Sequence, residues 1–173
     1  MEIIFQLALI IVPSGAVLIT AIFFMRKAAD KDIRTIQLEL KKERQTFFLP
    51  NRVDAYQRAV LLMERIHPNS LIMRHNNPGL PAAALQVQLL EAIRSEYEHN
   101  MAQQIFVSNE AWEMVKKAKD ETTRIVHLAG QQMEATSLAL DLSNKIFEIV
   151  GEVGTLPTEI AVDVLKKELQ GLF

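Results

Sequence analysis

The sequence predicts an all-α protein. A single N-terminal transmembrane helix is expected to continue into a stalk, and an α-helical bundle of about four to five helices follows it. Three observations lead to this fold class: an uncharged apolar run near the N-terminus, apolar residues at helical spacing over the rest of the chain, and no useful length of alternating strand pattern. We expect an anchor at 1–25, a helical stalk at 26–49 and a helical bundle domain at 50–173.

The run IIFQLALIIVPSGAVLITAIFFM, Ile3–Met25, contains 23 residues without a charge, whereas about 20 suffice to cross a bilayer. It begins after Glu2 and leads directly into Arg26, so we expect a retained signal-anchor rather than a cleaved signal peptide. Seven lysines and arginines follow within residues 26–44. The positive-inside rule therefore predicts an N-terminus outside and a cytoplasmic C-terminal domain. The inverted topology, with a lipid-side or peptidoglycan-side role, is the alternative.

Residues 26–49 contain no proline or glycine, so the helix is expected to continue as a stalk. Apolar residues recur there at spacings of 3, 4 and 7, which is typical of a coiled-coil seam: Ile33, Ile36, Leu40 and Phe47. The run is shorter than a sustained coiled coil, and Glu43 occupies one seam position. Both self-association into a homo-oligomer and docking against the chain's own domain agree with this pattern.

The charge and motif content excludes several classes of function. The net charge of −2 and the lack of an extended basic face argue against nucleic acid as a partner. The basic residues that follow the anchor fit anionic lipid headgroups instead. No cysteine is present, and phosphate-binding loops, zinc-protease motifs and serine elbows are all missing. We therefore expect no cofactor and no catalytic residues.

Turn and cap signals divide the rest of the chain into helices. Pro50 is expected to break the stalk, and a new helix follows at 51–66. LIMR, residues 71–74, is either a short extended piece or one helical turn. Further helices are expected at Pro81–Gln104, after an N-cap at Ser108, after the GQQMEATS segment, and from Pro157 onward. The helix after Ser108 carries a predicted buried stripe of Trp112, Val115, Ala118, Thr122, Ile125 and Val126.

Two Glu-x-x-His pairs, Glu64/His67 and Glu96/His99, match the spacing that di-iron helical bundles use. Such a centre also needs inward carboxylates from two further helices. The acidic residues of the later helices project away from their apolar faces at 100° per residue: Glu113, Asp120, Glu121, Asp141 and Glu148. The sequence therefore favours chance or surface pairing over a metal site.

The stretch RSEYEHNMAQQ, residues 94–104, contains the most unusual polar cluster. Helical projection places Glu96 and Asn100 among leucines, with His99 and Gln103 at the edge of that face. A carboxylate in such a place needs a cation or hydrogen-bond donors, and the candidates are Arg58, Arg65 and Arg74. The cluster is interpreted as an internal ion-pair or amide network, as a contact surface for a partner, or as a ligand or catalytic site.

Two segments carry a family resemblance: LPNRVDAYQRAVLLMERIHPNSLIMR and IRSEYEHNMAQQIFVSNEAWEMVKKAKDE. With them, the chain resembles an uncharacterised family of small, N-terminally membrane-anchored helical proteins from Bacteroidota. The resemblance is loose after Gly130. It implies no activity, and it implies a bacterial inner-membrane location.

Two hypotheses about function follow. The first is a non-enzymatic, single-pass membrane protein that acts as a scaffold or accessory subunit and binds other proteins through its helical domain. The second is a membrane-tethered enzyme or metal- or ligand-binding bundle that uses Glu96, His99 and Asn100.

Overall fold

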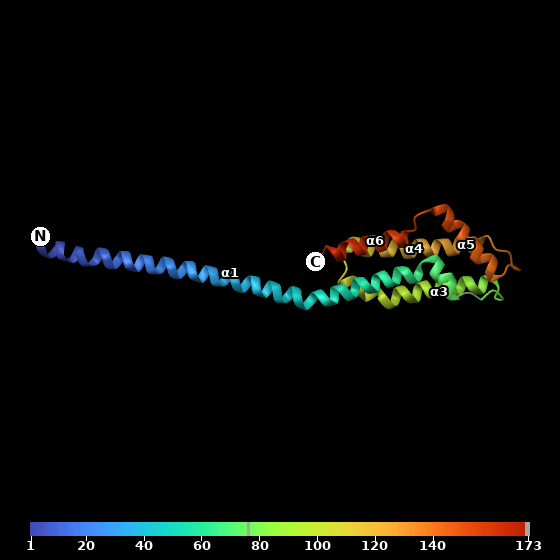
Figure 1. The fold of residues 1–173 in the computed structure, drawn as a ribbon, viewed down its shortest axis with the longest axis horizontal. Coiled ribbons are helices and arrows are strands. Elements are labelled where there is room, and N and C mark those ends of the chain that lie inside the picture. Colours follow the sequence, from blue (N-terminus) through green and yellow to red (C-terminus); the bar gives the residue numbers. More distant parts are fainter. Residues whose placement is uncertain (76, 172–173) are drawn as a thin grey trace. The chain divides into compact units, whose positions relative to one another are not determined.

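The structure of the protein is a computed structural model that describes residues 1–75 and 77–171, without the side chains of residues 3–14, 16, 17 and 19. The described residues form six α-helices and one 3₁₀ helix and contain no named strand, so the predicted all-α class is confirmed. In chain order (Figure 1) the helices are α1 (Glu2–Ile66), α2 (Pro68–His75), α3 (Ala82–Asn100), η1 (Met101–Ile105), α4 (Asn109–Gln131), α5 (Ala139–Val153) and α6 (Pro157–Gln170).

The chain divides into two compact units, Met1–Leu49 and Pro50–Phe173. The described part of the first unit is helical from Glu2 to its end. Among the described residues, no helix is both long enough and apolar enough to cross a membrane. The predicted anchor, Ile3–Met25, falls largely on residues whose side chains lie outside the described part.

One local prediction of secondary structure needs correction. Pro50 does not end a helix, because α1 continues without interruption to Ile66. A proline removes one backbone hydrogen bond, and the turns that follow it are held by the bundle core, where Ala55 and Tyr56 are buried. Of the two conformations expected for the LIMR segment, the helical one is confirmed, because the segment belongs to α2, where Leu71 and Ile72 are buried.

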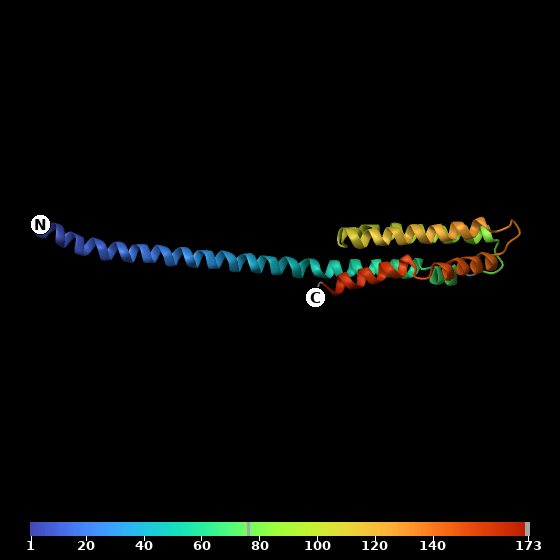
Figure 2. The same ribbon diagram turned by 90° about the horizontal axis from the view of Figure 1, so that it is seen from above.

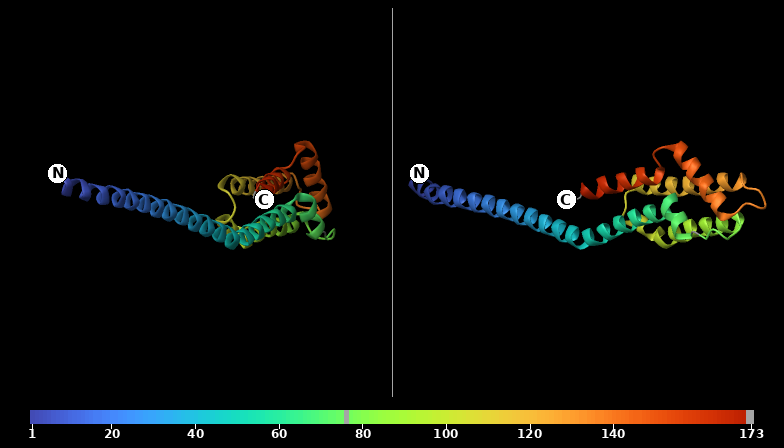
Figure 3. Two further views of the ribbon diagram at one scale, coloured as in Figure 1. Left: turned by 60° about the vertical axis from the view of Figure 1, so that its left-hand side comes forward. Right: turned by 45° about the vertical axis from the view of Figure 1, so that its right-hand side comes forward.

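In the second unit the chain crosses the bundle four times, in alternating directions. The last turns of α1 run one way, α3 returns, α4 runs with α1, and α6 returns (Figures 1 and 2). In the view of Figure 2, α3 and α4 form one layer, and the end of α1 lies beside α6 in the other. The shorter helices α2 and α5 pack together at one end (Figure 3).

The core of the bundle consists of the apolar stripes that the spacing predicts. On α4 the whole predicted stripe from Trp112 to Val126 is buried, and the predicted N-cap is confirmed because Ser108 Oγ accepts from Ala111 N at 3.1 Å. The other helices contribute Ala59, Leu62, Met63 and Ile66 of α1, Leu85, Leu89 and Ile93 of α3, Leu142 and Ile146 of α5, and Ala161 and Leu165 of α6.

Backbone contacts fix the connections at the α2–α5 end of the bundle. Ala82 N donates to Ser137 O at 2.9 Å, and Ala139 N donates to Leu80 O at 2.8 Å. These two bonds join the segments that precede α3 and α5. Gly154 then ends α5 with a φ of 75°, a left-handed conformation that glycine adopts without a steric penalty. The break lets α6 begin at Pro157, where its missing N–H is not needed.

Candidate functional site

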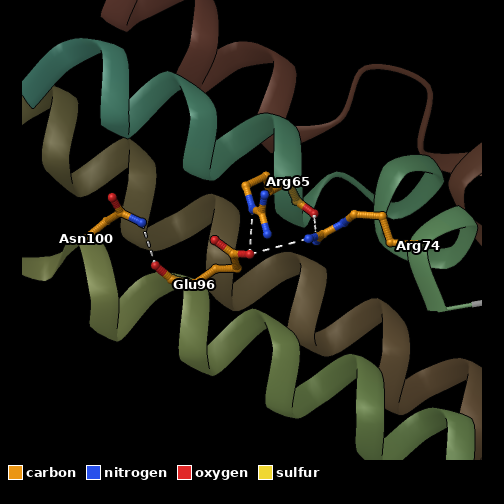
Figure 4. A network of polar contacts seen from close by, with 4 residues as sticks. All are labelled: Arg65, Arg74, Glu96 and Asn100. Atoms are coloured by element: carbon orange, nitrogen blue, oxygen red, sulfur yellow. Dashed lines mark hydrogen bonds and ion pairs between the residues drawn. The ribbon is translucent and has the colours of Figure 1, made fainter. Parts of the chain in front are cut away.

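Glu96 finds its cations within its own chain. Arg65 of α1 donates from Nε to Glu96 Oε1 at 2.5 Å, and Arg74 of α2 approaches the same oxygen from Nη1 at 3.4 Å (Figure 4). The Glu96 side chain is 18% exposed and is therefore largely buried. Two of the three arginines that the sequence offered therefore meet this carboxylate. Arg58 is engaged elsewhere, because its Nε lies 2.7 Å from Asp54 Oδ2, one helical turn earlier.

Arg74 also holds the end of α1. Its Nη2 donates to the backbone oxygen of Arg65 at 2.6 Å, in the last turn of the helix, where carbonyl groups lack intrahelical partners. One guanidinium thus joins the C-terminal end of α1 to the Glu96 carboxylate on α3 (Figure 4). Both arginine side chains keep a third or more of their surface in solvent, so solvent screening limits each pair to roughly 1 kcal/mol.

Asn100 contacts the backbone of Glu96 rather than its carboxylate. Its Nδ2 donates to the backbone oxygen of Glu96 at 2.8 Å, not to the carboxylate (Figure 4). Asn100 is buried and is the last residue of α3. The bond is a local one, from the side chain to the carbonyl four residues earlier on the same helix. His99 is exposed, and Gln103 is half-buried in η1. The structure therefore brings Arg74, Glu96 and Asn100 together and leaves His99 and Gln103 outside this network.

A cleft of about 350 Å³ opens on the solvent side of this network. It is lined by Arg58, Leu61 and Arg65 of α1 and by Ser95, Glu96, His99 and Asn100 of α3. Leu61 is 56% exposed, although its neighbour Leu62 is fully buried. The lining of the cleft thus combines one exposed apolar side chain with charged and polar groups.

A second polar node, which the sequence analysis missed, links α1 to α4 and α6. Glu168 of α6 accepts from Tyr56 Oη through Oε2 and from Ser108 Oγ through Oε1, both at 2.8 Å. Burial of the Tyr56 ring, followed by the hydrogen bond to Glu168, raises the pKa of the phenol above its ordinary value. The node joins α1, α6 and the N-cap of α4. Only the N-cap signal at Ser108 pointed to it, because no local pattern connects residues 112 positions apart.

The predicted stalk seam lies on the first unit. Ile33, Ile36, Leu40 and Phe47 fall on one face of α1, and all four are exposed, by 54%, 54%, 49% and 72%. Glu43 occupies the missing seam position and is exposed as well. The seam is thus an exposed apolar stripe on α1 within the first unit.

Comparison with known families decides the family of the chain. A family model described as a family of unknown function, DUF7935, matches residues 2–172. The chain belongs to this family. The match includes the region after Gly130, where the resemblance drawn from the sequence was loose. Searches of curated proteins and of solved structures found no match.

In this DUF7935 protein the two Glu-x-x-His pairs lie in different clefts. Glu96 and His99 line the cleft around Leu61, whereas Glu64 and His67 line another of about 420 Å³ between α1, α2 and the start of α6. His67 Nε2 lies 3.7 Å from Glu159 Oε1 there. Among the described residues, no three histidine, aspartate or glutamate side chains are grouped closely enough to hold a metal ion.

The second cleft of the DUF7935 chain contains one buried polar atom. Thr158 Oγ1 lies in the first turn of α6 and has no hydrogen-bond partner among the described residues. The charged lining of this cleft is mixed, with Glu64, Asp163 and Lys166 on its walls. This mixture favours no single class of ligand.

Proposed function

We propose that this DUF7935 protein is a non-enzymatic, single-pass membrane scaffold or accessory subunit whose helical bundle binds another protein. Its binding surface is the cleft between α1 and α3 around Leu61. The observation that carries the proposal is the exposed Leu61 side chain, which lines the cleft together with Arg58 one turn before it and Arg65 one turn after it on α1. A partner that places an apolar side chain on Leu61 and hydrogen-bonding groups beside it would complement this surface.

The internal network supports a binding surface more than a reaction site. Glu96 Oε1 is shared by Arg65 and Arg74, so this carboxylate is already engaged within the chain. The Asn100 amide donates a hydrogen bond to a backbone carbonyl. These groups fix the positions of α1, α2 and α3 relative to one another. Because these contacts hold the cleft in one conformation, less conformational entropy is lost when a protein segment binds, and the affinity is higher.

The proposed location is a bacterial inner membrane, with the N-terminus outside and the bundle in the cytoplasm. The uncharged run of 23 residues at Ile3–Met25 and the seven cations after it support this topology. The origin in Bacteroidota that the resemblance implies is part of the same proposal. Membranes washed with alkaline carbonate should retain the full chain, and protease added to intact spheroplasts should spare the bundle. Release by carbonate, or cleavage in spheroplasts, would contradict the anchor or its direction.

Co-purification of the full-length chain with its partner tests the binding function. Leu61→Asp should abolish recovery of a specific partner from solubilised membranes, because it places a carboxylate at the apolar centre of the cleft. Leu140→Asp on α5 is the matched control, since Leu140 is 55% exposed and Leu61 is 56% exposed. Equal recovery with the two variants, or no specific partner with the unaltered chain, would contradict the proposal.

A further inference from the structure

The exposed stripe on α1 in the first unit has the register of a two-stranded coiled coil. With Ile33, Leu40 and Phe47 at a positions, Ile36 and Glu43 fall at d positions. The apolar members of the stripe are all about half exposed or more. A helix surface with this pattern is usually buried against a second helix. The register also assigns the flanking positions: Glu39 is at g and Arg44 is at e.

We propose that this stripe binds the same stripe on a second copy of the chain, and that the two stalks form a short parallel coiled coil. The charges that flank the seam indicate that a second copy of the chain binds it in parallel. In a parallel pair, a g residue faces the e residue five positions later on the other chain. Glu39 of each copy then faces Arg44 of the other, and two attractive pairs flank the Leu40 layer. An antiparallel pair centred on Leu40 would instead place Glu39 opposite Glu39.

These two charges are available for a second chain. Within the described residues, neither Glu39 nor Arg44 forms an ion pair, and the Arg44 Nε contacts only the backbone oxygen of Leu40, at 3.4 Å. On the bundle, by contrast, exposed charges pair within their own helix, as Arg58 does with Asp54 and Arg94 with Glu98. The stalk therefore offers a complementary pair of charges that its own helix does not use.

Glu43 interrupts the apolar stripe at one d position. A carboxylate at a d position lowers the stability of a coiled coil and restricts its register. In the parallel arrangement Glu43 lies in the layer that Arg44 of the second copy flanks, so a cation is adjacent to it. A sliding register would move the carboxylate against an isoleucine or leucine instead. Glu43→Leu should accordingly strengthen the dimer.

The seam is short, so its strength depends on local concentration. Anchoring in one membrane confines both copies to a surface and gives them the same direction, which raises their effective concentration. The gain in effective concentration rests on the membrane anchor of the proposed function. The argument from the charges does not depend on the anchor, because the pairing of Glu39 with Arg44 favours the parallel direction without a membrane.

Disulfide trapping tests the proposal, because the chain contains no native cysteine. Full-length Ile36→Cys should form a disulfide-linked dimer on mild oxidation, since facing seam positions bring two Cα atoms within the roughly 4.4–6.8 Å that a disulfide spans. Leu38→Cys is the control: Leu38 lies on the opposite face and is more exposed than Ile36, at 68% against 54%. The seam variant should give a yield on the order of ten-fold higher.

Charge reversal then tests the direction. In the Ile36→Cys background, Glu39→Arg and Arg44→Glu should each lower the yield several-fold when expressed alone, and co-expression of the two should restore it. Equal trapping of Ile36→Cys and Leu38→Cys, no trapping of either, or no restoration on co-expression would overturn the proposal. The comparison is made both in membranes and with purified protein in detergent. If carbonate extraction shows that the chain is not membrane-anchored, the difference in disulfide yield between Ile36→Cys and Leu38→Cys in detergent still tests whether the dimer forms.

Discussion

Arg65 Nε and Glu96 Oε1 lie 2.5 Å apart although 31 positions separate the two residues in the chain. This contact joins α1 to α3 at the cleft that we propose as a binding surface. Arg74 reinforces it from α2 and at the same time holds the last turn of α1. The same carboxylate therefore shapes both the bundle and the wall of the cleft.

Replacing that carboxylate should destabilise the bundle measurably. Glu96→Gln removes the charge that faces two guanidinium groups and should cost about 1 kcal/mol, in agreement with hydrogen bonds to charged groups that solvent partly screens. Glu98→Gln is the matched control, because Glu98 pairs only with Arg94 on an exposed helix face. Thermal unfolding of the full chain in detergent, followed by circular dichroism, measures both. An equal, small effect of the two substitutions would show that the Glu96 network adds no stability.

The two glycines near the C-terminal end of α5, Gly151 and Gly154, should differ in their tolerance of substitution. A Cβ added at Gly151 or at Gly154 would meet no atom within 4 Å, so crowding affects neither position. Gly154 alone has a positive φ, of 75°. Gly154→Ala should therefore destabilise the bundle by about 1–3 kcal/mol, whereas Gly151→Ala, inside α5, should be neutral or stabilising by up to about 1 kcal/mol. Unfolding of the two variants side by side measures this difference, and the reverse order would contradict the assigned backbone conformation.

Alkaline pH should weaken the bundle through Tyr56. Burial and the hydrogen bond to Glu168 raise the pKa of this phenol in the folded chain above the value of 10.0 expected when unfolded. The folded state thus favours the protonated phenol, so its contribution is complete below pH 10 and is lost as pH rises toward the folded pKa. Stability measured from pH 8 upward should fall less steeply in Tyr56→Phe than in the unaltered chain. Parallel curves for the two proteins would contradict this assignment.

Metal analysis separates the proposed scaffold from the ligand-binding alternative. Protein purified without chelators should contain no stoichiometric transition metal, because the two Glu-x-x-His pairs line separate clefts. Elemental analysis of the full chain checks this expectation. A content of about one or two metal ions per chain would favour the alternative that uses Glu96 and His99.

Local patterns in the sequence predicted most of the helices but not how they meet. The α4 stripe and the Ser108 cap follow from helical spacing and cap chemistry, and both are confirmed. Pro50 misled the prediction, because a proline weakens a helix locally, whereas burial of the turns after it is a tertiary effect.

The candidate site shows the same limit. Helical projection found that Glu96 needs a cation and named the three arginines that could supply one. Only the fold shows that Arg65 and Arg74 reach Glu96. Arg58 could have been set aside from the sequence, because its spacing from Asp54 favours an ion pair within one helix. The contact between Tyr56 and Glu168 has no local signal at all, because only the return of α6 along α1 brings the two together.

Photo-crosslinking from position 61 tests the central claim most directly. A photoreactive residue replaces Leu61 in the full-length chain in native membranes, and the same residue at Leu140 provides the control of equal exposure. The scaffold account predicts one discrete heavier adduct from position 61, absent from position 140, containing the protein that co-purifies with the unaltered chain and not with Leu61→Asp. No adduct at position 61, or the same adducts at both positions, would contradict it.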